Sequence, residues 1–143
     1  MRSPDFLTAV GIGVSDLARS ADFYRRVLGM AETGRFSPPE MDEIMLAHEG
    51  RPAVVLMHWT DGSKPKCADN PVKLVFYVTD PVRFAEAVRA EGLEVTREAA
   101  PLESMGGALI ALAKDPDGYV LEFIESPAAL AERRAREAAP TAA

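Results

Sequence analysis

Two stretches of the chain repeat one pattern of apolar and polar positions. They are AVGIGVSDLARSADFYRRVLGM (residues 9–30) and KLVFYVTDPVRFAEAVRAEGL (residues 73–93). Each begins with an apolar run typical of a strand, continues through Ser-Asp or Thr-Asp into a helical pattern, and ends at a glycine and an apolar residue. The pattern therefore predicts a strand and a helix, written twice.

The boundaries of both predicted helices carry cap residues. Asp16 and Asp80 stand where a carboxylate accepts hydrogen bonds from the amides of the first turn. Pro81 would occupy the first helical position, where its missing N–H costs nothing. Gly29 and Gly92 stand where a left-handed residue ends a helix.

Strand-like runs follow each helix, at about 30–36, 41–48 and 52–59, and at about 93–98, 107–113 and 118–125. The repeated unit is therefore βαβββ, and the predicted fold class is α+β. We expect a first module over residues 5–60, a polar linker over 61–71, a second module over 72–126 and a charged C-terminal tail over 127–143. Its segment AALAERRAREAA predicts a helix, either a solvated appendage or an oligomer contact.

Composition narrows the classes of partner. The chain has 143 residues, 48% of them hydrophobic and 27% charged, with a net charge of −6. The charge and the lack of a basic run argue against a nucleic-acid surface, and the apolar runs are too short to span a membrane. Cys67 is the only cysteine, so we expect a plain surface thiol in a soluble, cytoplasmic protein.

Two motifs carry a resemblance to a known family. They are VSDLARSADFYRRVLGM in the first module and KDPDGYVLEFIE in the second. With them the chain resembles the vicinal oxygen chelate (VOC) superfamily, which includes glyoxalase I, the bleomycin-resistance proteins and the extradiol dioxygenases. The resemblance covers residues 7 to 126. It implies two βαβββ modules that form a cupped mixed sheet, paired within one chain or swapped in a homodimer, with the active site in the cup.

The resemblance also implies four metal-ligand positions, on the first and last strand of each module. Carried onto this chain, these positions fall at Ala9, Leu56, Lys73 and Glu122. Alanine and leucine offer no lone pair, and a protonated lysine repels a cation. Since one carboxylate cannot hold a catalytic divalent ion alone, we expect no metal and no other cofactor.

Strand alternation predicts which side chains line the cup. Apart from a few polar groups, the predicted lining is apolar or small, which suits a small apolar or aromatic molecule. Met105, in the SMGG segment, is expected at a lid or a plain turn beside it. The expected binding residues are Ala9, Gly11, Gly13, Val54, Leu56, Trp59, Val75, Met105, Val120 and Ile124.

The expected catalytic residues are Glu122, Lys73, His58 and Tyr77. In the implied fold Lys73 and Glu122 occupy two ligand positions of one module, so their charged groups should lie within salt-bridge reach. The pair could be a structural strut, or Lys73 could simply extend into water. Alternatively, Glu122 is a general base and Lys73 an acid or oxyanion donor. His58 is either a neutral base or a strand-end histidine bonded to a loop carbonyl.

Together these features favour a metal-independent enzyme that transfers a proton next to a carbonyl, of the isomerase, lyase or cyclase type. Classical glyoxalase activity fits less well, because Gly13 stands at the usual first-strand arginine position and the loop PLESM is not basic. A binding protein of the bleomycin-resistance type is one alternative. A metal-dependent, glyoxalase-like lyase with a shifted site, using His58, Glu122 and His48, is the other.

Overall fold

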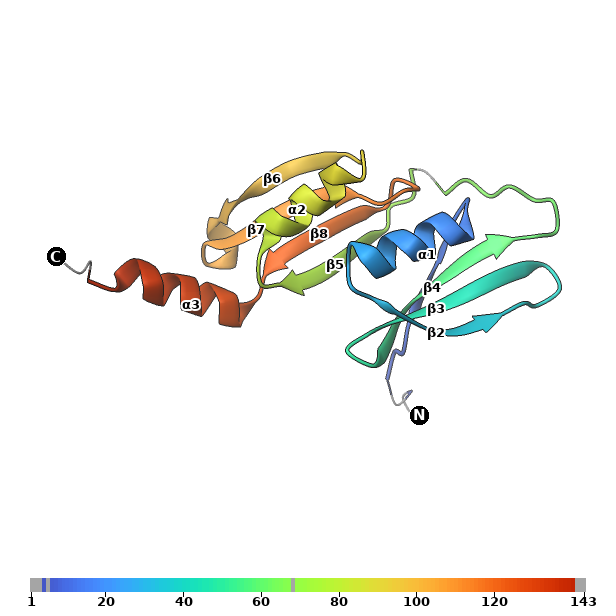
Figure 1. Ribbon diagram of the computed structural model, residues 1–143, viewed down its shortest axis with the longest axis horizontal. Coiled ribbons are helices and arrows are strands. Elements are labelled where there is room, and N and C mark those ends of the chain that lie inside the picture. Colours follow the sequence, from blue (N-terminus) through green and yellow to red (C-terminus); the bar gives the residue numbers. More distant parts are fainter. Residues whose placement is uncertain (1–3, 5, 68, 141–143) are drawn as a thin grey trace. The chain divides into compact units, whose positions relative to one another are not determined.

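The computed structural model describes residues 4, 6–67 and 69–140. It divides into two compact units, Met1–Asn70 with Pro116–Gly118, and Pro71–Asp115 with Tyr119–Ala143. Each unit is described by itself (Figure 1). Among the described residues, no helix has the length and apolar character needed to cross a membrane.

The first unit is a four-stranded sheet with one helix. The strand order in the sheet is β1-β4-β3-β2. Strand β1 pairs in parallel with β4, whereas β4 with β3 and β3 with β2 form antiparallel pairs. The elements are β1 (Val10–Gly13), α1 (Leu17–Arg26), β2 (Ala31–Phe36), β3 (Met41–His48) and β4 (Arg51–Trp59).

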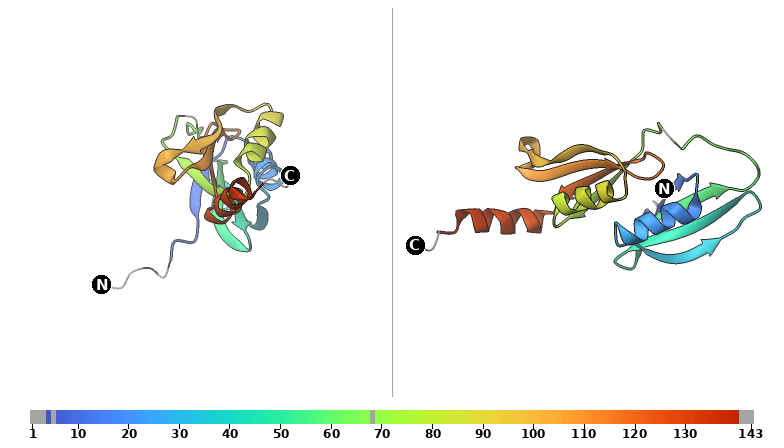
Figure 2. Two further views of the ribbon diagram at one scale, coloured as in Figure 1. Left: turned by 90° about the vertical axis from the view of Figure 1, so that its left-hand side faces the viewer. Right: turned by 45° about the horizontal axis from the view of Figure 1, so that its top comes forward.

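The second unit repeats this topology and adds a terminal helix. Its sheet has the order β5-β8-β7-β6, again with a parallel pair, β5 and β8, at one edge. In Figure 2 the helix α3 extends beyond this sheet toward the C-terminus. The elements are β5 (Lys73–Val78), α2 (Pro81–Ala90), β6 (Val95–Leu102), the 3₁₀ turn η1 (Glu103–Met105), β7 (Ala108–Lys114), β8 (Val120–Glu125) and α3 (Pro127–Ala138).

The α+β class and the twofold βαβββ repeat are confirmed. The carboxylate of Asp16 accepts a hydrogen bond from the Arg19 amide at 2.9 Å, and Asp80 accepts one from Arg83 at 3.2 Å. Residues 61–67 and 69–72 contain no helix or strand. The domain boundaries drawn from the sequence stay a prediction.

One predicted strand was misplaced. The segment expected at 93–98 is β6, which runs from Val95 to Leu102. Two irregularities, between Val95 and Arg97 and between Arg97 and Ala100, let β6 stay paired with β7 as far as Leu102. A β-bulge adds residues without ending the pairing, and the hydrophobic pattern does not reveal it.

In each unit the helix covers one face of the sheet. In the first unit, α1 buries Phe23 and Tyr24, whose rings meet edge to face at 5.4 Å. In the second, the Phe84 ring on α2 stacks on Phe123 of β8 at 5.3 Å. The buried strand residues of the first unit's helix-covered face include Ile12, Ile44, Leu46, Val54 and Leu56. We call the opposite face of each sheet its open face.

Helix α3 is fastened to the second unit by a buried carboxylate. Glu125, 4% exposed, accepts hydrogen bonds from Arg133 Nε at 2.8 Å and Nη2 at 2.9 Å. Arg133 Nη2 also donates to the carbonyl oxygen of Gly107 at 2.9 Å, and the Leu109 amide donates to Glu125 at 3.0 Å. The C-terminal helix is therefore attached to its own unit through Arg133, whereas most of its other residues are exposed, so it stays a solvated appendage or an oligomer contact as predicted alternatives.

Replacing Arg133 should release α3. Arg133→Ala leaves the Glu125 carboxylate without its charge partner in a buried position, so the free energy of opening α3 should fall by about 2 kcal/mol. Amide hydrogen exchange in residues 127–138 should then accelerate about 30-fold. Arg136→Ala, an exposed substitution on the same helix, is the control; equal acceleration in both variants would contradict the assignment.

The same ion pair predicts a pH dependence. Hydrogen bonds from Arg133 lower the pKa of Glu125 from its ordinary value of 4.5. The folded state therefore favours the ionised carboxylate, so its stabilisation is complete above pH 4.5 and is lost as the pH falls through the lowered pKa. In urea denaturation followed by circular dichroism, wild type should be more stable than Glu125→Gln at about pH 6, and the difference should shrink at about pH 3. A difference that is constant with pH would argue against the pair.

Candidate functional site

The open face of the second sheet carries a Lys–Glu ion pair. Strands β5 and β8 are parallel, and Val75 is the register partner of Glu122. Lys73 lies two residues before Val75 and so points to the same face. Lys73 Nζ lies 2.7 Å from Glu122 Oε2, with the lysine side chain 51% exposed and the glutamate side chain 16% exposed.

Apolar and aromatic side chains surround this pair. Val75 is 53% and Tyr77 65% exposed, next to Lys73 along the same face of β5. Val120 and Ile124 flank Glu122 on β8, as strand alternation predicts. The structure thus brings six of the predicted site residues together on one face: Lys73, Val75, Tyr77, Val120, Glu122 and Ile124.

Sequence reasoning missed the neighbours that β6 and β7 contribute. Leu112 pairs with Glu122, and Arg97 pairs with Leu112, so the half-buried Arg97 shares the open face. Lys114 pairs with Val120 and forms its own ion pair with Glu94 at 2.9 Å. Alternation along β7 is a signal that could have identified Leu112 and Lys114, whereas the register irregularities in β6 hide the position of Arg97 from any such count. The open face therefore carries two cations besides Lys73, of which Lys114 is paired with Glu94 rather than with Glu122.

The open face of the first sheet is lined by glycine, methionine and tryptophan. A Cβ at Gly11 would lie 3.0 Å from Met57 Sδ, and one at Gly13 would lie 3.1 Å from Trp59 Cζ3. The two glycines therefore make room for large side chains of β4. Ala9 lies one residue before β1 and is half-buried.

Val54 and Leu56 were assigned to the wrong face. Val10 pairs with Val54 and Ile12 with Leu56, so both side chains lie on the helix-covered face, where they are 4% and 0% exposed. The partner of Gly11, and hence the counterpart of Glu122, is Val55. Because side chains alternate, the one-residue error in aligning β4 moved the whole set to the opposite face.

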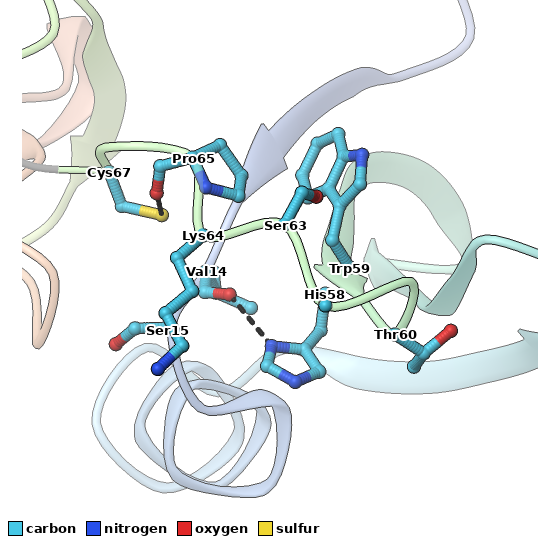
Figure 3. Close-up of a pocket in the computed structure, with 10 residues that line it drawn as sticks. Val14, Ser15, His58, Trp59, Thr60, Ser63, Lys64, Pro65 and Cys67 are labelled. Carbon is cyan, nitrogen blue, oxygen red and sulfur yellow. Dashed lines mark hydrogen bonds between the residues drawn. The ribbon is translucent and has the colours of Figure 1, made fainter.

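His58 also lies on the helix-covered side of β4, at its end. Its Nδ1 is 3.1 Å from the carbonyl oxygen of Val14, as the dashed line in Figure 3 shows. This geometry is the second alternative given above for His58, a histidine at the end of a strand that is bonded to a carbonyl oxygen. The structure places His58 in the first unit and Glu122 in the second.

A shifted metal site is not assembled by the two histidines. His58 pairs with Asp42 and His48 with Arg51, which places them at opposite ends of the β3–β4 hairpin. Among the described residues, no group of three or more His, Cys, Asp or Glu side chains could hold a metal ion.

The four family ligand positions do not fit a metal either. Once Leu56 is replaced by Val55, the four ligand positions are Ala9, Val55, Lys73 and Glu122. Only Glu122 offers lone pairs, and an ammonium group lies 2.7 Å from it. This donor set does not suit a divalent ion.

Two other predicted residues lie at exposed or peripheral positions. Met105 ends the turn η1 and is 42% exposed. The thiol of Cys67 lies 3.6 Å from the carbonyl oxygen of Pro65, in the loop that follows Trp59.

The contact between Gly13 and Trp59 can be tested by fluorescence. Trp59 is the only tryptophan, and Gly13→Ala adds a methyl group 3.1 Å from its ring, a distance at which the ring must move, so the emission spectrum should shift. In Gly34→Ala the added Cβ would lie 3.3 Å from Phe36, an exposed side chain that can move aside. That control should keep the wild-type spectrum; an unchanged spectrum in Gly13→Ala would contradict the close contact.

Comparison with known proteins agrees with this fold. Residues 7–123 match the model of the Glyoxalase/Bleomycin resistance protein/Dioxygenase superfamily. A protein named lactoylglutathione lyase from Haemophilus influenzae is 36% identical over 118 residues, covering 79% of this chain and 87% of that protein.

Solved structures agree as well. Glyoxalase I from Zea mays superposes with a TM-score of 0.71 at 25% identity, covering 83% of this chain and 44% of the maize chain. This chain thus spans less than half of the maize enzyme. The trypanothione-dependent glyoxalase I of Leishmania major has the same fold, with a TM-score of 0.72 at 20% identity and coverage of 93% of this chain and 95% of that one. The chain belongs to the glyoxalase/bleomycin resistance protein/dioxygenase superfamily, also called the vicinal oxygen chelate superfamily.

Proposed function

We propose that this protein is a metal-independent enzyme that transfers a proton next to a carbonyl group of a small, largely apolar substrate. The observation that carries the proposal is the Lys73–Glu122 ion pair on the open face of the second sheet, with 2.7 Å between Nζ and Oε2. A base and a cation side by side are the two groups that enolisation requires.

The proposed step uses only groups on this face. The Glu122 carboxylate removes a proton from the carbon beside the carbonyl, and the electron pair of that C–H bond forms the C=C bond of an enolate. The Lys73 ammonium donates a hydrogen bond to the enolate oxygen, where negative charge accumulates. Returning the proton from Glu122 to the same carbon regenerates the substrate with its proton exchanged. In a β,γ-unsaturated carbonyl compound the electron pair extends to the γ-carbon, and returning the proton there moves the C=C bond next to the carbonyl, an isomerisation with no co-reactant.

The surrounding side chains suit this chemistry. Val75 and Val120 provide apolar contact on either side of the ion pair, and the exposed Tyr77 adds an aromatic surface and a hydroxyl donor. The partly buried position of Glu122, 16% exposed against 51% for Lys73, favours contact with a substrate that excludes water.

The relatives named lactoylglutathione lyase support the lyase class among the reaction types considered. The donor set at positions 9, 55, 73 and 122 supports a route without a metal, since Ala9 and Val55 cannot ligate. Lys73 occupies one of these positions and supplies a positive charge in place of a Lewis acid.

A binding protein of the bleomycin-resistance type is the second candidate. It is favoured by the exposed apolar groups of the same face, since Val75 and Tyr77 are each more than half exposed. Such a protein needs apolar walls and no base. In that case Glu122 and Lys73 would neutralise each other and take no part in chemistry.

The proposal extends to a cytoplasmic homodimer. The exposed large apolar side chains Val75, Tyr77 and Phe36 support further burial by a partner copy. The single cysteine supports a reducing compartment. In the first unit the remaining candidates for ligand contact are His58, Trp59, Ala9, Gly11 and Gly13, and in the second unit Met105 is one.

Deuterium exchange tests the enzyme directly. Chelator-treated protein in D₂O should exchange the protons beside the carbonyl of phenylacetone or a related aryl ketone, followed by proton NMR. Glu122→Gln should slow the exchange about 100-fold or more, because it removes the base. Lys73→Ala should slow it similarly, whereas Lys73→Arg should retain part of the activity.

Lys114→Ala is the matched control, since Lys114 lies on the same face but pairs with Glu94. It should leave the exchange rate unchanged. Tight binding of the ketones without exchange would favour the binding protein. Activity that chelation abolishes and Ni²⁺ or Zn²⁺ restores would overturn the metal-independent mechanism.

A further inference from the structure

The open face of the first sheet carries a carboxylate among methionines and aromatic rings. Glu43 lies on β3, with Met57 of β4 as its register partner on one side and Phe36 of β2 on the other. Directly opposed residues of antiparallel strands point to the same face. The next residue of β3, Ile44, is 1% exposed on the helix-covered side. The side chains of Glu43, Met57 and Phe36 therefore share the open face.

Two further methionines lie on either side of this carboxylate along β3. A Cβ at Gly34 would lie 3.3 Å from Phe36 Cζ and 4.0 Å from Met45 Cβ, so the ring and this methionine lie beside the glycine on the same face. Met41 lies on the other side of the carboxylate, and its register partner is Trp59. The carboxylate is thus surrounded by apolar and polarisable groups.

Glu43 has no partner for its charge. It is half-buried and forms no hydrogen bond or ion pair with any described residue. A carboxylate that is partly removed from water without gaining a partner is energetically unfavourable. The open face of the second sheet shows the contrasting case, because Lys73 Nζ lies 2.7 Å from Glu122 there. A bound cation could supply the charge that the first sheet lacks.

We propose that this face is a binding site for an apolar organic cation, an amine attached to an aromatic or aliphatic body. The ammonium group would pair with the Glu43 carboxylate. The apolar body would lie on Phe36 and Met57, where an aromatic ring also attracts positive charge. Methionine side chains are flexible and polarisable, so such a face adapts to bodies of different shape.

This site goes beyond the proposed proton transfer and uses neither Lys73 nor Glu122. Loss of binding at the first sheet would leave the proton-transfer function standing, and loss of proton transfer would leave this site standing. The charge of the ligand decides the binding, because an alcohol of the same size cannot neutralise Glu43 and an acid is repelled by it.

The probe is phenethylamine, compared with the neutral 2-phenylethanol and the anionic phenylacetate. Trp59, the only tryptophan, lies on the same face, so its fluorescence should report binding by the full-length protein. Wild type should bind the amine about five-fold more tightly than the alcohol, and the acid more weakly than either.

Methionine methyl signals in carbon-13 NMR locate the site. The signals of Met41, Met45 and Met57 should shift with the same saturation curve as the fluorescence. Met30, 2% exposed in the core of the first unit, and Met105, in the second unit, are internal references that should not shift.

Glu43→Gln should bind the amine about five-fold more weakly and leave the affinity for the alcohol unchanged. Asp42→Asn is the matched control, because it removes the same charge one residue away on the opposite face of β3. This control should keep the wild-type preference for the amine. Phe36→Ala should weaken the amine and the alcohol by a similar factor of about three, since it removes apolar contact.

Four results would each overturn the proposal. They are equal affinity of wild type for the amine and the alcohol, an equal loss of preference in Asp42→Asn and Glu43→Gln, shifts at the two reference methionines as large as those on the face, and no saturable change at millimolar amine. The wild-type affinities and methyl shifts decide the question even if a variant fails to fold.

Discussion

Each four-stranded sheet of this protein has one helix to cover it, so only one of its two faces can be buried. In the first unit α1 covers the face of Ile12 and Leu56, and in the second α2 covers the face of Phe123. Each open face then has a composition of its own: glycine, methionine and tryptophan in the first unit, and charged groups among apolar ones in the second. Functional side chains can occupy only the faces that the helices leave uncovered.

The register of the parallel edge pairs decides which residues those are. Val75 opposite Glu122 places the carboxylate beside Lys73, and Gly11 opposite Val55 places an apolar group at the equivalent point of the other unit. The two units have the same topology but differ in chemistry at the same position. The proposed catalytic pair therefore has no counterpart in the first unit, although the two units share one topology.

The C-terminal helix illustrates how a polar segment is held in place. Its attachment depends on the buried carboxylate of Glu125, which receives two hydrogen bonds from Arg133, and on the carbonyl oxygen of Gly107. A carboxylate at 4% exposure without such a partner would be costly. The same arginine therefore fixes both α3 and the turn before β7, next to the exposed Met105.

The sequence by itself determined the repeat and the caps at Asp16 and Asp80, because these depend on local periodicity. The closeness of Lys73 to Glu122 was implied by the resemblance to the family, and the pairing of β5 with β8 accounts for it. Only the tertiary structure decided the face of Leu56, the place of Arg97 beside Leu112 and the carbonyl partner of His58. A one-residue slip reverses every side chain of a strand, and a bulge shifts the count without changing the hydrophobic pattern. Such details are set by pairing between distant segments, which the order of residues within one strand does not encode.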